Sequence, residues 1–208
     1  MKVVLLHAFP LDERMWEEQQ GIAPRLYGRG RTMDAWAESI ASEIDDEVVL
    51  VGASMGGYCA LAFARKFPER VRGLLLVGAR PDADSDERRA GRAKTIELIR
   101  NEGPEALWQD MVPKLFANGR NADERLLHRN GDELVAAVEA IRDRADLTHV
   151  ARHPHGRVRF VVGEHDPFVS ADELRGFDVR EIRGAGHLVN LEQRDEFNEL
   201  LKEFIADV

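Results

Sequence analysis

Short apolar runs, separated by stretches with helical spacing, are the feature of this sequence that most restricts its fold. The runs are rich in Val and Leu, end at turn-forming residues, and occupy 2–7 (KVVLLH), 21–24 (GIAP), 47–52 (EVVLVG), 71–78 (VRGLLLVG), 157–163 (RVRFVVG) and 178–184 (DVREIRG). Between the second and third runs, apolar residues recur at the spacing of a helix, at Met33, Trp36, Ile40 and Ile44. Strands that are apolar on both faces are typical of a parallel sheet covered by helices. The sequence therefore predicts an α/β fold with a mostly parallel sheet of about six strands.

The alternation of strands and helices stops between residues 82 and 153. This segment has several amphipathic helical patterns and no clear strand, with apolar stripes at Leu107, Met111 and Leu115 and at Val135, Val138 and Ile141. The segment is either a set of extra packing helices or a cap over one end of the sheet, and its position between two strands favours the cap. We therefore expect a core of residues 1–81 and 154–208 and a helical cap insertion of residues 82–153.

Two helix starts are marked by single residues. Pro104 suits the first turn of a helix, because a proline lacks the N–H that a first turn leaves unpaired. Asn190, with Gln193 three residues later, is predicted to cap the last helix, whose apolar stripe includes Phe197 and Leu201.

Length and charge limit the classes of partner. A chain of 208 residues is long enough for one domain with a full core. Its net charge of −9 opposes binding to phosphate-rich surfaces, so we expect neither a nucleic-acid nor a membrane partner. Cys59 is the single cysteine and is interpreted as a packed thiol. The opening MKVVLL is too short for the apolar part of a signal peptide, so we expect a cytoplasmic protein.

The strongest chemical motif is the G-x-S-x-G formed by Gly52, Ser54 and Gly56, between a predicted strand and a predicted helix. At such a turn the serine has a strained backbone, and the small residues two positions away on either side prevent collisions with it. The helix that follows points its N-terminus at the serine, where backbone dipoles favour developing negative charge. Ser54 is therefore the predicted nucleophile, with a tight turn of no chemical function as the alternative.

A serine nucleophile needs a base, and His187 in IRGAGHLVN is the predicted one. It follows the last predicted strand in a glycine-rich loop. His7 lies in the opening loop, and the pair in HPH at 153–155 belongs to no cluster of metal ligands, so a solvated loop explains that pair better. Because a histidine base must be uncharged, we expect activity to fall as pH drops below about neutrality.

The third group should be a carboxylate that orients the histidine. Asp166 in FVVGEHDPFVS directly follows a strand and lies between Ser54 and His187 in the chain. The order Ser, Asp, His is the one that hydrolases with this type of serine turn use. Asp82, also just past a strand, and Asp84 are the alternatives, and a simple turn role for Asp166 is a further one.

These residues together make the chain similar to the α/β-hydrolase superfamily, in particular to small serine esterases that share features with enol-lactonases. The likeness covers nearly the whole chain, through HAFPLD, GASMGG, GEHDPFVS and GAGH in that order. It implies that a small-molecule carboxylic ester is cleaved through an acyl-enzyme, with no metal or organic cofactor. It also implies that the backbone N–H groups of Phe9 and Met55 form the oxyanion hole. We interpret His7 as a residue that braces this loop by hydrogen bonds, with help from Asp12.

The sequence departs from that family in two places. Ala8 stands where the family usually has glycine, so the loop must have a backbone that a β-carbon tolerates. The chain also starts almost at this loop, which implies a sheet trimmed at the N-terminal edge and open to pairing as a homodimer.

The substrate remains open at this stage. The same triad also serves lactones, thioesters, C–C bonds beside a ketone and perhydrolysis, and a receptor that binds a small molecule without turnover is a further alternative. Four apolar residues of the insertion either line the substrate pocket or only pack the cap: Trp108, Met111, Leu115 and Phe116.

Overall fold

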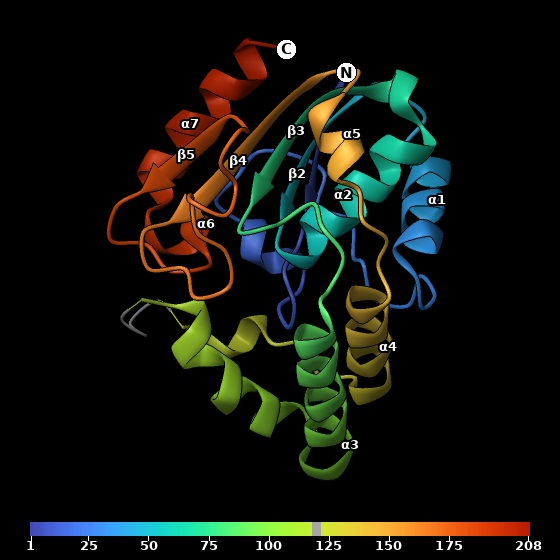
Figure 1. The fold of residues 1–208 in the computed structure, drawn as a ribbon, viewed down its shortest axis with the longest axis vertical. Helices are drawn as coiled ribbons and strands as arrows, with labels where there is room; N and C mark the ends of the chain where they lie inside the picture. The colour runs from blue at the N-terminus through green and yellow to red at the C-terminus, as the bar shows by residue number, and fades with distance from the viewer. Residues whose placement is uncertain (118–121) are drawn as a thin grey trace.

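A parallel sheet of five strands forms the centre of the computed structural model, which describes residues 1–117 and 122–208 (Figure 1). The strands are neighbours in chain order: β1 (Lys2–Leu6), β2 (Val48–Ala53), β3 (Val71–Val77), β4 (Arg157–Gly163) and β5 (Val179–Ile182). Each pairs in parallel with the next. The predicted α/β fold is confirmed.

The run at 21–24 forms a single bridge rather than a sixth strand. Ile22 pairs in parallel with Val4, as Leu5 N–H donates to Ile22 O at 2.8 Å and Ile22 N–H donates to Val3 O at 2.8 Å. Pro24 has no N–H with which to extend the ladder. The segment therefore covers part of the outer edge of β1.

Helices cover both faces of the sheet, which explains why its strands are apolar on both sides. Alternate strand residues such as Leu50 and Leu74 pack with α1 (Met33–Glu43), α2 (Met55–Lys66) and α5 (Thr148–Arg152). The residues between them, such as Val49 and Leu75, pack with α7 (Arg194–Ala206) and the short η1 (Glu13–Trp16). A further short helix, η2 (Pro68–Arg70), leads into β3.

The predicted helical insertion lies beyond the end of the sheet, where Figure 1 shows α3 (Asp86–Leu115) and α4 (Gly131–Arg142) below the strands. The short η3 (Glu124–Leu126) lies between them in the chain. α3 is kinked at Gly103, which has φ 86° and ψ 179°, and its second half starts at Pro104 as the sequence predicts. The division into a core and a cap ending at residue 153 stays a prediction.

The predicted cap of the last helix is wrong. Asn190 lies inside the short α6 (Val189–Glu192), and its Nδ2 donates to Met15 O at 3.1 Å. α7 follows Gln193, which makes no capping hydrogen bond with its side chain. The asparagine is used to join this segment to η1, a long-range contact that the local sequence pattern does not reveal.

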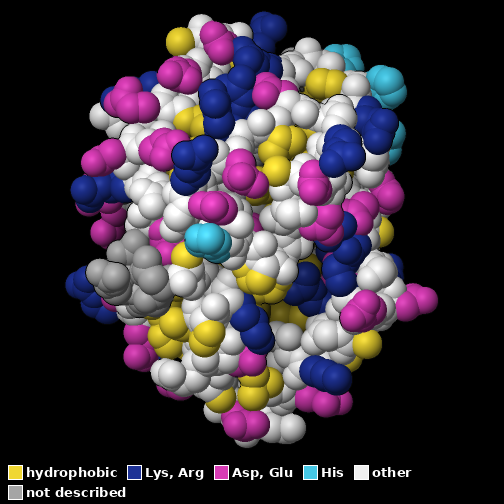
Figure 2. All heavy atoms as spheres, turned by 60° about the vertical axis from the view of Figure 1, so that its left-hand side comes forward, with side chains coloured by type: hydrophobic (Ala, Val, Ile, Leu, Met, Phe, Trp, Pro, Cys, Tyr) yellow, Lys and Arg dark blue, Asp and Glu magenta, His cyan; other side chains and the backbone are white. Residues whose placement is uncertain are grey.

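The surface carries charges of both signs. Figure 2 shows basic and acidic side chains interspersed over one face, with hydrophobic side chains gathered toward the half where α3 and α4 lie. Within residues 1–117 and 122–208, no helix combines the length and apolar character needed to cross a membrane.

Candidate active site

Ser54 occupies the strained turn between β2 and α2. Its φ is 48°, and among the described residues it is the only one other than glycine with a positive φ. Its N–H donates to Val77 O at 2.7 Å, which fixes the turn to β3. A β-carbon at Gly52 would lie 2.5 Å from Gly56 O, and one at Gly56 would lie 2.1 Å from Leu6 O. The motif therefore has glycine at both positions because no larger residue fits there.

His187 and Asp166 form a buried pair. His187 Nδ1 lies 2.8 Å from Asp166 Oδ2, and their side chains are 3% and 0% exposed. The other carboxylate oxygen accepts from the N–H groups of Phe168 at 2.8 Å and Val169 at 3.3 Å. These two backbone bonds hold the carboxylate in place, and the carboxylate holds the imidazole ring.

The alternative carboxylates face arginines instead. Asp82 bonds Arg80 at 2.6 Å and Arg88 at 2.7 Å, and these bonds outweigh burial and lower the pKa of Asp82. Asp84 is buried against Arg144 at 2.7 Å. Of the three carboxylates, Asp166 is the one that the structure pairs with His187.

The loop that carries His187 is packed closely. His187 N–H donates to Leu115 O at 3.1 Å, and the ring of Phe168 meets the imidazole edge-on at 4.7 Å between centroids. Gly78, with φ 56°, passes so close that a β-carbon there would lie 2.9 Å from His187 Nδ1 and Cε1. The position of the imidazole is therefore set from three sides.

Ser54 and His187 line one small pocket with a cavity volume of about 30 Å³. Its other described lining residues are Phe9, Tyr58, Arg92, Met111, Ile141 and Phe168. Met111, one of the four apolar residues of the insertion considered for the substrate pocket, is among them. Trp108, Leu115 and Phe116 are instead buried in the apolar cluster around Ala185 and Leu188, because this part of α3 packs on the loop of His187.

Four lining residues were not anticipated. Tyr58 stands one helical turn after Ser54, so the spacing along α2 could have identified it. Phe168 follows Asp166 by two residues in the same loop. Arg92 and Ile141 belong to α3 and α4, and nothing in their local sequence separates them from other residues of those helices.

Of the two expected oxyanion donors, Phe9 lines the same pocket as Ser54 and Met55 follows Ser54 in the chain. Phe9 lines the pocket, and no described residue accepts a hydrogen bond from its N–H. Met55 is the first residue of α2, so its N–H has no partner within the helix. Ala8 avoids a positive φ, and its N–H points to Met15 Sδ at 3.2 Å, so the loop forms without the family's glycine.

His7 braces this loop and is not a base. Its Nε2 accepts from Leu26 N–H at 3.0 Å, which leaves the proton on Nδ1 to donate to Ala8 O at 3.2 Å. Burial lowers the pKa of His7 to about 4, so the ring is neutral near pH 7.

The insertion holds the same loop from the other side. Asp12 N–H donates to Leu126 O at 3.0 Å, and His128 N–H donates to Pro10 O at 3.0 Å. Tyr27 donates its hydroxyl to Leu11 O at 2.9 Å, and its ring lies 4.9 Å from His7 and 3.9 Å from His128 between centroids. The loop of residues 7–12, called the oxyanion loop after its expected donor Phe9, is therefore bonded to residues 126–128 of the insertion.

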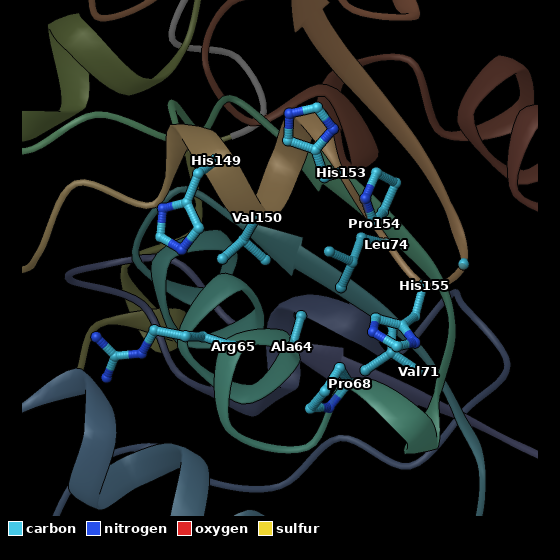
Figure 3. Close-up of a pocket in the computed structure, with 11 residues that line it drawn as sticks. Ala64, Arg65, Pro68, Val71, Leu74, His149, Val150, His153, Pro154 and His155 are labelled. Carbon is cyan, nitrogen blue, oxygen red and sulfur yellow. The ribbon is translucent and has the colours of Figure 1, made fainter.

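A larger cavity of about 240 Å³ lies at the opposite end of the sheet, between α2 and α5 (Figure 3). Figure 3 shows the imidazoles of His149, His153 and His155 well apart around it. Within the described parts of the chain, no three His, Cys, Asp or Glu side chains come close enough to hold a metal ion. This cavity shares no residue with the pocket of Ser54.

Known proteins resemble the chain in both sequence and fold. A thermophilic esterase from Thermogutta terrifontis, solved with malate bound, is 30% identical and has a TM-score of 0.87 over 99% of this chain and 89% of its own. The enol-lactonase from Burkholderia xenovorans LB400 shares the fold, with a TM-score of 0.84 at 21% identity over 98% of this chain and 90% of its own.

Curated relatives match to different extents. The 2-hydroxy-6-oxo-2,4-heptadienoate hydrolase of Pseudomonas putida is 43% identical, over 89% of this chain and 75% of its own length. A pimeloyl-[acyl-carrier protein] methyl ester esterase from Aromatoleum aromaticum is 34% identical, but over only 38% of this chain and 37% of its own length. The model of the alpha/beta hydrolase family matches residues 3–200. With the fold and these matches in agreement, the chain is a member of the alpha/beta hydrolase family.

Proposed function

We propose that this protein is a serine hydrolase that cleaves a carboxylic ester of a small molecule through an acyl-enzyme. The observation that carries the proposal is the 2.8 Å contact between His187 Nδ1 and Asp166 Oδ2, behind a pocket that both His187 and Ser54 line. The carboxylate of Asp166 accepts a hydrogen bond from Nδ1–H of His187, which keeps the proton on Nδ1 and leaves Nε2 as the acceptor for the hydroxyl of Ser54.

In the first step, Ser54 Oγ attacks the ester carbonyl while His187 Nε2 accepts the hydroxyl proton. The negative charge that forms on the carbonyl oxygen is stabilised by the N–H groups of Phe9 and Met55. His187 then donates the proton to the leaving alcohol, and Asp166 stabilises the imidazolium during the transfer.

In the second step, water replaces the alcohol. His187 removes a proton from the water, the hydroxide attacks the acyl carbon, and the same two N–H groups stabilise the second oxyanion. The acid product leaves and Ser54 regains its proton. None of these steps needs a metal or an organic cofactor, and the single buried Cys59 takes no part, since burial raises its pKa to about 12.

The Thermogutta terrifontis esterase supports the ester as the bond cleaved, because it is 30% identical and matches nearly the whole chain. A second candidate is hydrolysis of a C–C bond beside a ketone, which the 43% identity to the Pseudomonas putida 2-hydroxy-6-oxo-2,4-heptadienoate hydrolase favours. Both reactions would use the same triad, and both are proposed to take place in the cytoplasm.

The test is turnover of p-nitrophenyl acetate and butyrate together with labelling by a fluorophosphonate probe. We expect the wild-type protein to release p-nitrophenol and to take up one probe on Ser54. The Ser54→Ala variant should lose the label and fall in rate by at least a thousandfold.

An unlabelled wild-type protein with no turnover that depends on Ser54 would rule out the hydrolase and favour a small-molecule receptor. The second candidate is tested with 2-hydroxy-6-oxo-2,4-heptadienoate as substrate. A higher kcat/KM on this compound than on any ester tested would identify the C–C bond, rather than the ester, as the bond that the protein cleaves.

A further inference from the structure

One basic side chain enters the pocket of Ser54. Arg92, from the first half of α3, lines it, and the eight described lining residues include no other Lys or Arg and no Asp or Glu. The rest of the lining is mostly apolar or aromatic. The side chain of Arg92 is half-buried, and a guanidinium in such surroundings attracts an anion more strongly than one in open water.

The bonding of Arg92 leaves donors for a ligand. Its Nε donates to Asp84 Oδ2 at 3.1 Å, and this bond restricts the orientation of the guanidinium group. No described residue accepts a hydrogen bond from the two terminal nitrogens of Arg92. An arginine held at Nε presents these nitrogens as a fork that matches the two oxygens of a carboxylate.

Asp84 neutralises Arg92 only in part, because three guanidinium groups share this one carboxylate. Its buried carboxylate already bonds Arg144 at 2.7 Å and lies 3.2 Å from Arg88 Nε. In the surrounding network, four guanidinium groups share three carboxylates: Arg80, Arg88, Arg92 and Arg144 with Asp82, Asp84 and Glu173. One positive charge is left over, on a chain whose net charge is −9.

We infer that Arg92 binds a carboxylate of the substrate, so the preferred substrate is a short ester that carries a second, ionised carboxyl group. The inference rests on the proposed ester hydrolysis and names its substrate class.

Two methyl esters of the same shape test this charge preference: monomethyl succinate, with a terminal carboxylate, and methyl 4-methylpentanoate, with two methyl groups in place of its oxygens. Methanol release gives kcat/KM for each. We expect the wild-type protein to prefer the charged ester by at least about tenfold. Arg92→Gln should lower the ratio of the two kcat/KM values by about ten- to a hundredfold, mostly through KM, the range expected for a hydrogen bond to a charged group.

Arg88→Gln is the matched control, because Arg88 shares Asp84 with Arg92 but does not line the pocket. It should leave the ratio unchanged. Arg92→Lys keeps the charge but loses the fork, so its ratio should lie between those of the wild type and Arg92→Gln. An equal fall in Arg88→Gln and Arg92→Gln would assign the effect to Asp84 and overturn the inference.

A binding measurement separates this inference from the proposed function. Calorimetric titration of succinate into Ser54→Ala and into Ser54→Ala with Arg92→Gln measures the anion site without turnover, and the second variant should bind at least tenfold more weakly. Equal affinities would overturn the role of Arg92. If the wild-type protein cleaved the charged and the uncharged ester with equal kcat/KM, the proposed hydrolase would stand and the carboxylate site would be overturned. If the wild-type protein cleaved no ester but Arg92→Gln still weakened succinate binding, the carboxylate site would stand and the proposed hydrolase would be overturned.

Discussion

Gly78 decides how closely the backbone can approach the imidazole of His187. A β-carbon there would lie 2.9 Å from two ring atoms, and its φ of 56° disfavours any other residue. We expect Gly78→Ala to displace the ring and lower kcat by about a hundredfold or more, because a shift of about 1 Å in a reacting group can cost that much. Steady-state ester hydrolysis measures it.

Gly91→Ala is the matched control for that substitution. Gly91 is an exposed helical residue of α3, with nothing within 4 Å of an added β-carbon. Its replacement should leave kcat unchanged and raise the free energy of unfolding by up to about 1 kcal/mol. A Gly78→Ala protein with normal kcat would show that the loop of His187 gives way, contrary to the expectation.

Asp166→Asn separates the two tasks of this side chain. The amide oxygen can keep the bonds to Phe168 N–H and Val169 N–H, while its NH2 group replaces the oxygen that faces His187. The loop should therefore stay folded while the imidazole takes the wrong tautomer. We expect kcat to fall about 10³- to 10⁴-fold with little change in thermal stability. Asp82→Asn, outside the site, should retain kcat, and similar losses in both variants would argue against the role of Asp166.

Single residues also show how far sequence alone leads to the site. Ser54, Asp166 and His187 each follow a strand in a short loop of marked composition, so local pattern was enough to choose them. Local pattern does not single out Arg92, because the chain has many arginines and its position at the pocket depends on how α3 and α4 pack beyond the end of the sheet. Trp108 and Phe116 follow the packing alternative, which sequence alone left open because the pattern identifies a buried helix face but not which neighbour covers it.

At the scale of elements, the oxyanion loop depends on contacts that are distant in the chain. Tyr27 donates to Leu11 O, and its ring stacks on His128 and meets the ring of His7 at a tilt. Tyr27→Phe keeps the ring but leaves Leu11 O without this donor. We expect the free energy of unfolding to fall by about 1–2 kcal/mol and kcat to fall several-fold, because the loop that carries Phe9 N–H loosens.

Chemical denaturation and steady-state kinetics measure the two effects separately. Ser42→Ala serves as control, since it removes an exposed hydroxyl that donates to Ser39 O at 2.7 Å, far along the chain from the loop. If Tyr27→Phe lowered stability and left kcat untouched, the tyrosine would have a structural role only.

The strands were more predictable than the helices of the insertion. Runs rich in Val and Leu are needed wherever a strand is covered on both faces, so five of the six predicted runs are strands. The sixth run, at 21–24, forms only a single bridge, because it has few apolar residues and Pro24 lacks the N–H needed for a further hydrogen bond to β1. The kink at Gly103 was partly foreseen through Pro104, whereas the angle between α3 and α4 depends on packing between distant residues.

For the whole molecule, buried His7 makes folding sensitive to acid. Burial lowers its pKa from 6.5 to about 4, so between these values the unfolded chain binds a proton that the folded chain does not. Stability therefore falls as pH drops below about 6.5, and the contribution of His7 reaches about 3 kcal/mol near pH 4. Urea denaturation across this range should show a steeper pH dependence in the wild type than in His7→Asn.

His165→Asn is the control for that comparison, because the side chain of His165 is 56% exposed. It should leave the pH dependence of stability as in the wild type. Identical slopes for the wild type and His7→Asn would mean that His7 is not the proton site that governs the acid sensitivity.

A second copy of the chain stays a predicted partner. Ile22 already hydrogen-bonds Leu5 N–H and Val3 O on the outer edge of β1. Less of that edge is therefore open to pairing with a second copy than the sequence predicts. Light scattering after size exclusion measures the oligomeric state.

The hydrogen bonds that residues 126–128 make to the oxyanion loop limit how this enzyme can diversify. In a modular hydrolase, the insertion could be exchanged to change the substrate while the core kept its rate. Here a transplanted insertion without equivalents of Leu126 O and His128 N–H would leave Asp12 N–H and Pro10 O unpaired. Selection for a new substrate would then alter the rate of the chemical step as well, so specificity and turnover are expected to evolve together.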